Sequence, residues 1–135
     1  MNIKKFFLAF VVVFLVGFTL NFVIHGVLLQ GDYSQLPNLL RTEQDAQGYF
    51  HFMILANLLY SLALVWIYAQ GVSDKPWLGQ GVRFGLAVWL LTAVPTYLTY
   101  YAVQPWPPEV IVKSIGFDLV RLLVIGVVAA AVYRK

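Results

Sequence analysis

Two charged residues lie three positions apart in an otherwise apolar part of the chain. Asp118 and Arg121 stand in SIGFDLVRLLVIG, a stretch apolar enough to cross a membrane. Counted from Val110, a helix places them about 12 and about 16 Å below its end, near the middle of a bilayer. Because a charge at that depth is costly, both side chains are expected to face the interior of a helix bundle and to pair with each other.

Three roles for this pair stay open on sequence alone. It can be a structural pair that fixes the register of the helices, a binding or proton-relay site, or a contact to another subunit. The structural role is the leading interpretation, because Arg121 has an intrahelical partner in Asp118.

Polar residues also recur at helical spacing in the other apolar segments. Asn21 and His25 are four residues apart and share a helix face, which favours hydrogen bonds to a neighbouring helix. For His25, the expected partner is Asn57 or Tyr100, and the imidazole is expected to be neutral. Together these residues predict an intramembrane polar site in the outer half of the protein. Its predicted members are Asn21, His25, Asn57, Thr96, Tyr100, Asp118 and Arg121.

The chain has two histidines, and their expected depths match. His25 near the end of one segment and His51 near the start of the next could serve as two axial haem ligands or as metal ligands. No third ligand is evident, so no metal site and no cofactor are expected, and a bis-histidine haem or metal protein is retained only as a second alternative. The absence of cysteine excludes disulfides and thiolate ligands.

Catalytic signatures are absent from the sequence. It contains no H-E-x-x-H, no G-x-S-x-G and no Walker loop, so an enzymatic reading has no nucleophile and base to rest on. The protein is therefore expected not to be an enzyme.

The elements that must position these residues are membrane helices. Hydrophobic residues make up 61% of the 135 residues and charged residues 11%, well below the roughly 25% charged residues of a soluble domain. Four apolar segments are each near the ~20 residues that cross a hydrocarbon core. They predict an all-α integral membrane protein of one domain, residues 1–135, folded as an antiparallel four-helix transmembrane bundle. The predicted spans are 6–29, 49–69, 82–101 and 110–133.

Lysine and arginine positions predict the orientation of this bundle. Six of the nine basic residues flank one side of the predicted membrane, and only Arg41 and Lys113 lie on the other. By the positive-inside rule both termini are cytoplasmic, and the loop 30–48 is outside. The basic residues cluster at segment ends and form no stripe, so the lipid bilayer is an expected partner and nucleic acid is not.

Two local motifs predict helix structure in more detail. Thr42 with Asp45 resembles a capping box, so the second helix is expected to begin before its apolar part. Gly81 and Gly85 form a G-x-x-x-G, which is typical of close packing between membrane helices.

Four short stretches carry a resemblance to a known group of proteins. HGVLL at 25–29, GVRFGL at 81–86, YYAVQPWP at 100–107 and the terminal YRK together resemble small four-span bacterial inner-membrane proteins of no assigned activity. The resemblance covers most of the chain and implies a bacterial cytoplasmic-membrane location. It lends no reaction, cofactor or catalytic residue.

Two classes of function follow from these observations. The first is a non-catalytic accessory or structural subunit, packed against other membrane subunits or against itself, which small size and abundant apolar surface favour. The second is a small binding or transport unit with an outward-facing polar pocket, in which Arg121 holds an anionic group and His25 or Asp118 carries a proton. Whether the polar residues line a wet cavity or meet a partner distinguishes the two.

Overall fold

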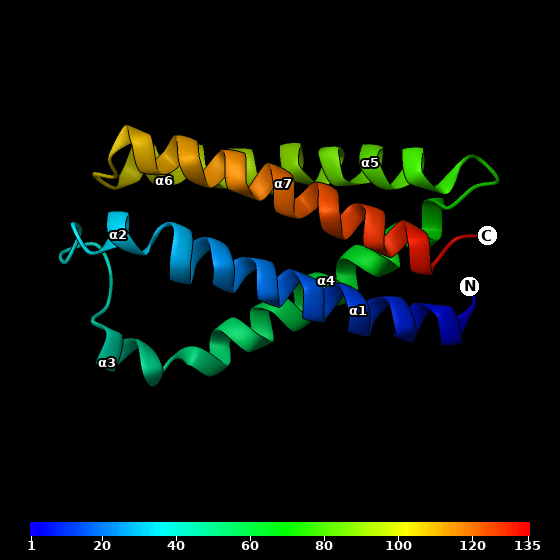
Figure 1. Cartoon of the computed structure of the whole chain (residues 1–135), viewed down its shortest axis with the longest axis horizontal. Coiled ribbons are helices and arrows are strands. Elements are labelled where there is room, and N and C mark those ends of the chain that lie inside the picture. Colours follow the sequence, from blue (N-terminus) through cyan, green and yellow to red (C-terminus); the bar gives the residue numbers. More distant parts are fainter.

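The computed structural model describes all 135 residues and consists of helices and loops alone. Four helical segments are long and apolar enough to cross a membrane: Ile3–Leu28, Phe50–Gly71, Trp77–Val103 and Pro108–Val132. The expected all-α class and the four membrane helices are confirmed. Figure 1 shows the chain crossing the molecule in alternating directions, so that both termini lie at one end. We call this the terminus end, and the opposite end the loop end.

The first two crossings are joined by the longest connection. Helix α1 (Ile3–Val23) continues into a π-helix, η1 (Ile24–Leu28), and then into the short α2 (Gln30–Tyr33). The Thr42 hydroxyl accepts a hydrogen bond from the Asp45 backbone N–H at 3.2 Å, as the capping motif predicts. The helix that it starts, α3 (Glu43–Gln47), is a separate short helix, and α4 (Phe50–Gly71) begins after Gly48 and Tyr49.

The third crossing is a composite helix. It consists of α5 (Trp77–Val88), a second π-helix η2 (Trp89–Ala93) and α6 (Val94–Val103). It begins at Trp77, five residues before the expected start at Val82. The apolar pattern predicts only the part of a helix inside the membrane core, and this helix extends beyond that part to its N-cap residue, Pro76. The last crossing is α7 (Pro108–Val132).

Glycines bring α5 and α7 into close contact. A Cβ built on Gly81 would lie 2.8 Å from the Gly126 carbonyl oxygen, and one built on Gly126 would lie 2.8 Å from the Gly85 Cα. No side chain fits at these positions, so the packing role predicted for the G-x-x-x-G is confirmed. We call this contact the glycine seam; its members are Gly81, Gly85 and Gly126.

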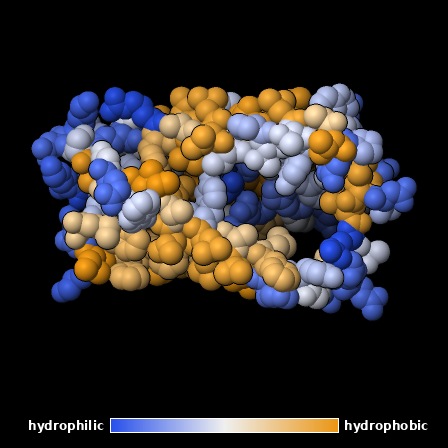
Figure 2. All heavy atoms as spheres, turned by 180° about the vertical axis from the view of Figure 1, so that it is seen from behind, coloured by the Kyte–Doolittle hydropathy of each residue, from blue (hydrophilic) through white to orange (hydrophobic).

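The second crossing is held differently. Helix α4 packs along α1 and has only a brief contact with α7, and no extended contact joins it to α5 or α6. Figure 2 shows the result as a hollow with a hydrophilic interior, whose rim is near-neutral above and apolar below. The bundle is therefore closed on the α5–α7 side and open between α4 and α6.

Candidate intramembrane polar site

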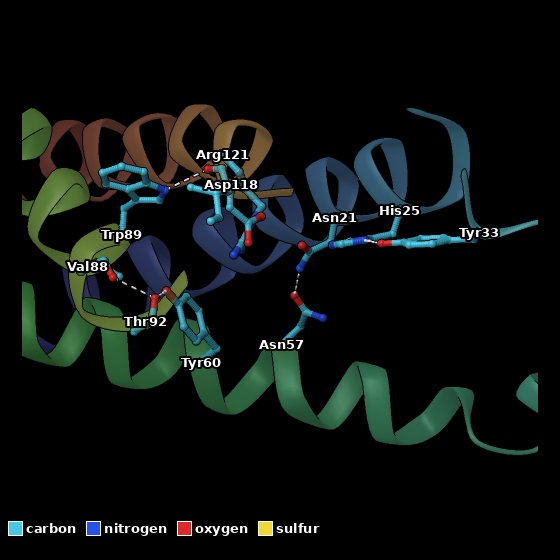
Figure 3. A network of polar contacts seen from close by, with 11 residues as sticks. Asn21, His25, Tyr33, Asn57, Tyr60, Val88, Trp89, Thr92, Asp118 and Arg121 are labelled. Carbon is cyan, nitrogen blue, oxygen red and sulfur yellow. Dashed lines mark hydrogen bonds and ion pairs between the residues drawn. The ribbon is translucent and has the colours of Figure 1, made fainter. Parts of the chain in front are cut away.

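The Asp118 and Arg121 side chains meet as the sequence predicts. Arg121 donates from Nε to Oδ1 of Asp118 at 3.0 Å, and the two side chains are 11% and 7% exposed respectively. Ser114, one turn before Asp118 on α7, is buried and donates its hydroxyl to the Val110 carbonyl at 2.7 Å. The ion pair therefore forms without the serine, and its side chains project from α7 toward the middle of the bundle (Figure 3).

Each partner of the pair keeps a polar atom free. No short hydrogen bond within the protein reaches the Arg121 Nη groups or the Asp118 Oδ2 atom, although the Tyr60 hydroxyl interacts with Arg121 and the Tyr97 hydroxyl with Asp118 at longer range. None of these atoms of the ion pair is fully enclosed; the one enclosed side-chain atom without a partner is the Tyr68 hydroxyl. The atoms of the pair are therefore accessible, and both residues line a cavity of about 260 Å³. Its walls come from α4, η2, α6 and α7: Tyr60, Thr92, Ala93, Thr96, Tyr97, Tyr100, Asp118 and Arg121.

Aromatic and hydroxyl side chains build the wall opposite the ion pair. The Tyr60 hydroxyl lies 3.4 Å from Thr92 Oγ1, which itself donates to the Val88 carbonyl at 2.8 Å. The Arg121 guanidinium carbon is 5.7 Å from the centroid of the Tyr60 ring, within the range of a cation–π interaction. Tyr60 thus reaches the arginine from α4, across the open side of the bundle.

A second cavity of about 690 Å³ lies toward the loop end. Within it, Asn21 donates from Nδ2 to Oδ1 of Asn57 at 2.9 Å, and Asn57 donates to the Met53 carbonyl at 2.9 Å. His25 and Tyr100 also line this cavity, and Tyr100 lines the first cavity as well. The two cavities therefore share one wall residue.

The expected partner of His25 was wrong. Its Nδ1 lies 2.6 Å from the Tyr33 hydroxyl, and Asn57 is bonded to Asn21 instead (Figure 3). The reason is local: η1 is followed directly by α2, so the chain turns back and places Tyr33, eight residues later, beside the imidazole. The two rings also stack, with centroids 6.0 Å apart.

Tyr33 keeps its phenolic proton over a wide pH range. Burial, and then the negative charges of Asp118 and Asp32, raise the pKa of Tyr33 to about 12. The hydroxyl is therefore protonated at neutral pH and can donate to an unprotonated Nδ1 of His25.

The two histidines occupy different surroundings. His51 is exposed near the start of α4, with its ring 4.2 Å from that of Phe52, and it lines neither of the two cavities. No group of three or more His, Asp or Glu side chains is placed to hold a metal ion. The matched depths of the histidines thus do not bring them into one site.

Both π-helices carry residues of the site. In each, a backbone N–H bonds five residues back, from Leu29 to Ile24 at 2.8 Å in η1 and from Val94 to Trp89 in η2. His25 lies in η1, and Trp89, in η2, donates its indole N–H to the Ile115 carbonyl of α7 at 2.9 Å. π-helical turns often occur at functional sites, and here His25 of η1 lines the larger cavity and Thr92 of η2 lines the smaller one.

All seven residues predicted for the site line the two cavities. Asn21, His25 and Asn57 belong to the larger one, Thr96, Asp118 and Arg121 to the smaller one, and Tyr100 to both. The prediction omitted four further contributors: Tyr33, Tyr60, Thr92 and Tyr97.

Some of the omitted residues carried a signal. Tyr60 follows Asn57 by three residues and so shares its helix face, and Thr92 precedes Thr96 by four residues, which also places the two on one face. Tyr33 carried none, because only the turn between η1 and α2 brings it to the site.

Comparison with known proteins places the chain in a family. A family model described as a protein of unknown function, DUF1761, matches residues 8–130. The chain belongs to this family. No curated protein and no solved structure matches it. The DUF1761 match runs through all four membrane helices and includes every residue that lines the two cavities, so the site lies within the part of the chain that defines the family.

Proposed function

We propose that this DUF1761 protein is a small, non-catalytic binding or transport unit of the membrane, whose polar pocket takes a small molecule with an anionic group. The observation that carries the proposal is the pair at the centre of α7. Arg121 and Asp118 neutralise each other, and each still presents a free polar atom to an open cavity. A pair with a purely structural role needs no such access to water or ligand.

The chemistry of the walls supports an anionic ligand of modest size. The arginine can offer its free Nη donors in the planar geometry that suits a carboxylate. Tyrosine and threonine hydroxyls surround it, and the phenol rings give an apolar body. The Asp118 carboxylate beside it disfavours a ligand with several negative charges and can accept a proton or an N–H donor.

Cysteine accessibility tests whether the pocket is wet. The chain has no cysteine, so all labelling of a variant with one introduced cysteine comes from that residue. Thr96→Cys lies in the smaller cavity, and Leu98→Cys, on the same helix, replaces a residue that is 54% exposed and lines neither cavity. A methanethiosulfonate reagent reacts with the thiolate, and a thiol ionises readily in a wet pocket but not on an apolar surface. We therefore expect the water-soluble reagent to label Thr96→Cys at least about tenfold faster than Leu98→Cys.

Ligand binding is tested by protection in the same assay. Benzoate, an aromatic carboxylate, should slow the labelling of Thr96→Cys, and Arg121→Gln in that background should abolish the protection. Equal labelling of the two cysteines, or protection that persists without Arg121, would contradict the proposed pocket.

The proposal includes an orientation and a location. We infer a bacterial cytoplasmic membrane, supported by the resemblance to small bacterial inner-membrane proteins, with both termini in the cytoplasm, supported by the excess of basic residues at the terminus end. Asn38→Cys in the long loop should react with an impermeant reagent in intact cells, and Lys4→Cys only after lysis. The opposite pattern would reverse the topology.

A second candidate function is that of an accessory subunit in a larger membrane complex. It is favoured by the third crossing, in which 6% of the apolar window is buried compared with 22 to 33% in the others, and by α6, which buries no residue. A photo-crosslinker at Leu91, 77% exposed, should then join the protein to another subunit or a second copy in cells. Crosslinks to lipid alone would contradict this role.

We also propose that the protein works without a resident haem or metal. The support is the separation of His25 and His51 into different surroundings. Protein purified without added cofactor should show no haem absorption band. A stoichiometric haem that each single His→Ala change removes would overturn this proposal.

A further inference from the structure

A further pocket, which shares no residue with the two cavities of the polar site, opens at the terminus end between α4 and α5. It has a volume of about 370 Å³ and is lined by the last turns of α4, the connecting loop and the first turns of α5. Its lining residues are Ile67, Tyr68, Gly71, Ser73, Lys75, Gln80, Arg83 and Phe84.

This pocket is rich in uncompensated positive charge. Lys75 and Arg83 both line it, and neither has a carboxylate within 4.0 Å. The nearest acid in sequence, Asp74, is 87% exposed and lies 3.5 Å from Lys135. Arg83 donates its Nε–H to the Gly79 carbonyl at 3.3 Å. The pocket therefore presents two cations that have no carboxylate partner, and no anion of its own.

The two ends of the bundle differ in this respect. At the loop end, Lys113 pairs with Asp32 at 3.1 Å and Arg41 with Asp45 at 2.9 Å. Orientation by positive charge alone explains why basic residues gather at the terminus end. It does not explain why two of them converge on one pocket.

The rim of the pocket is fixed before any ligand arrives. Gln80 accepts from the Ser73 backbone N–H at 3.0 Å and donates to the carbonyls of Ser73 and Lys75 at 3.0 and 2.5 Å. One side chain of α5 thus holds the connecting loop and the backbone of Lys75. A preorganised loop lowers the entropic cost of binding.

The apolar side of the pocket also suits a lipid. Ile67 and Phe84 line it, and the Tyr68 ring meets Phe84 edge to face at 5.2 Å. Tyr68 is 4% exposed, and its hydroxyl is the one enclosed side-chain polar atom of the protein without a hydrogen-bond partner. A buried hydroxyl left without a partner is costly, and a ligand oxygen that reached it would remove this cost.

We propose that this pocket binds the phosphate of an anionic phospholipid headgroup, through Arg83 and Lys75, with the acyl chains running along Ile67 and Phe84. Basic pockets at the edge of membrane helices are suited to such headgroups. The lipid is favoured over a free phosphate because the pocket joins a charged mouth to apolar walls at the end of two membrane helices.

Native mass spectrometry of the detergent-purified full chain tests the proposal. With equal amounts of phosphatidylglycerol and phosphatidylcholine added, we expect the protein to retain the anionic lipid preferentially. Lys75→Gln or Arg83→Gln should each reduce its retention about fivefold, and the double change should reduce it further. Lys4→Gln is the matched control, since it removes one exposed charge at the same end outside the pocket.

Each remaining outcome has a defined meaning. Equal retention of both lipids by the wild-type protein, which needs no variant, would overturn the proposal. So would a loss in Lys4→Gln as large as in Arg83→Gln, since net charge would then be the cause. Displacement of the lipid by inorganic phosphate at equal concentration would assign the pocket to a free phosphate and refute the lipid. Tyr68→Phe should weaken retention if the hydroxyl meets the ligand, and unchanged retention would remove Tyr68 from the proposed contacts.

Discussion

The glycine seam and the open side of the bundle are two opposite solutions to helix packing in a membrane. In the seam, α5 and α7 approach so closely that a single added Cβ would meet backbone. Between α4 and α6, bulky tyrosines and an ion pair occupy the interior, and a cavity remains. In lipid, where apolar side chains gain little from leaving the solvent, helices associate through close packing and hydrogen bonds.

The two halves of the third crossing are therefore held in different ways. Its first half, α5, is fixed to α7 by glycine contacts, whereas α6 lies beyond a π-helix and buries no residue. η2 stands between the two halves, and the Trp89 indole ties it to the Ile115 carbonyl of α7. A rigid half therefore supports the half that forms the pocket wall.

The largest effect on stability is expected at the ion pair of Asp118 and Arg121, on the open side of the bundle. Asp118→Asn leaves the mostly buried Arg121 without its anionic partner, and we expect a loss of about 3 kcal/mol in the free energy of unfolding. Arg121→Gln should cost a similar amount. Unfolding by sodium dodecyl sulfate in mixed micelles measures both.

The double change distinguishes a structural pair from a site with a third partner. Asp118→Leu with Arg121→Met removes both charges at similar volume and should recover much of the stability. A double variant no more stable than the worse single one would count against simple pairing.

The next largest effect belongs to the seam. Gly126→Ala places a Cβ 2.8 Å from the Gly85 Cα, so the helices must separate, and we expect a cost of about 1–3 kcal/mol. Gly116→Ala on the same helix is the control, because a Cβ there meets nothing within 4 Å. The control should be neutral or more stable, since alanine is favoured over glycine in a helix. Equal effects at both positions would refute the seam.

A smaller effect is expected at the loop end of the open side. Tyr33→Phe removes the hydroxyl that His25 contacts and should cost about 1 kcal/mol at pH 7. Because the pKa of folded Tyr33 lies near 12 and that of an unfolded tyrosine near 10, this contribution is fully present below pH 10. It is lost as pH rises from 10 through 12. A difference between wild type and variant that grows over this range would contradict the raised pKa.

The smallest effect is expected at the ion pair of Arg41 and Asp45, which matches the Asp118–Arg121 pair in distance but not in burial. Arg41 and Asp45 are 2.9 Å apart, but both side chains are about half exposed. Water screens the pair, so Asp45→Asn should leave the unfolding transition unchanged within error. A loss comparable to that of Asp118→Asn would show that burial is not what separates the two pairs.

Local pattern was sufficient for much of the site. The (i, i+3) spacing of Asp118 and Arg121 predicted their pairing, because this contact follows from helix geometry within one segment. The four-residue spacing of Asn21 and His25 placed both on the face that lines the larger cavity. The glycine spacing in α5 likewise predicted a close contact, although not with which helix.

The partners across helices were not predictable in the same way. Asn57 or Tyr100 was expected as the partner of His25, but the turn from η1 into α2 brings Tyr33 to the imidazole, and Asn57 bonds Asn21. The capping motif at Thr42 was read correctly as a helix start, but Gly48 and Tyr49 separate that helix from α4. The π-helices have no signal in a pattern read at 3.6 residues per turn, and they shift the faces of the residues that follow.

Periodicity and hydropathy alone predict the all-α class, the four membrane helices, the central ion pair and the polar faces, because they set the direction of each side chain on its own helix. The packed bundle was needed to see that α4 stands apart from α6, that two cavities share Tyr100 as a wall residue, and that Lys75 and Arg83 line one pocket. The reason is that the distance and rotation between helices depend on how all their side chains fit together, and this fit is a property of the packed bundle as a whole.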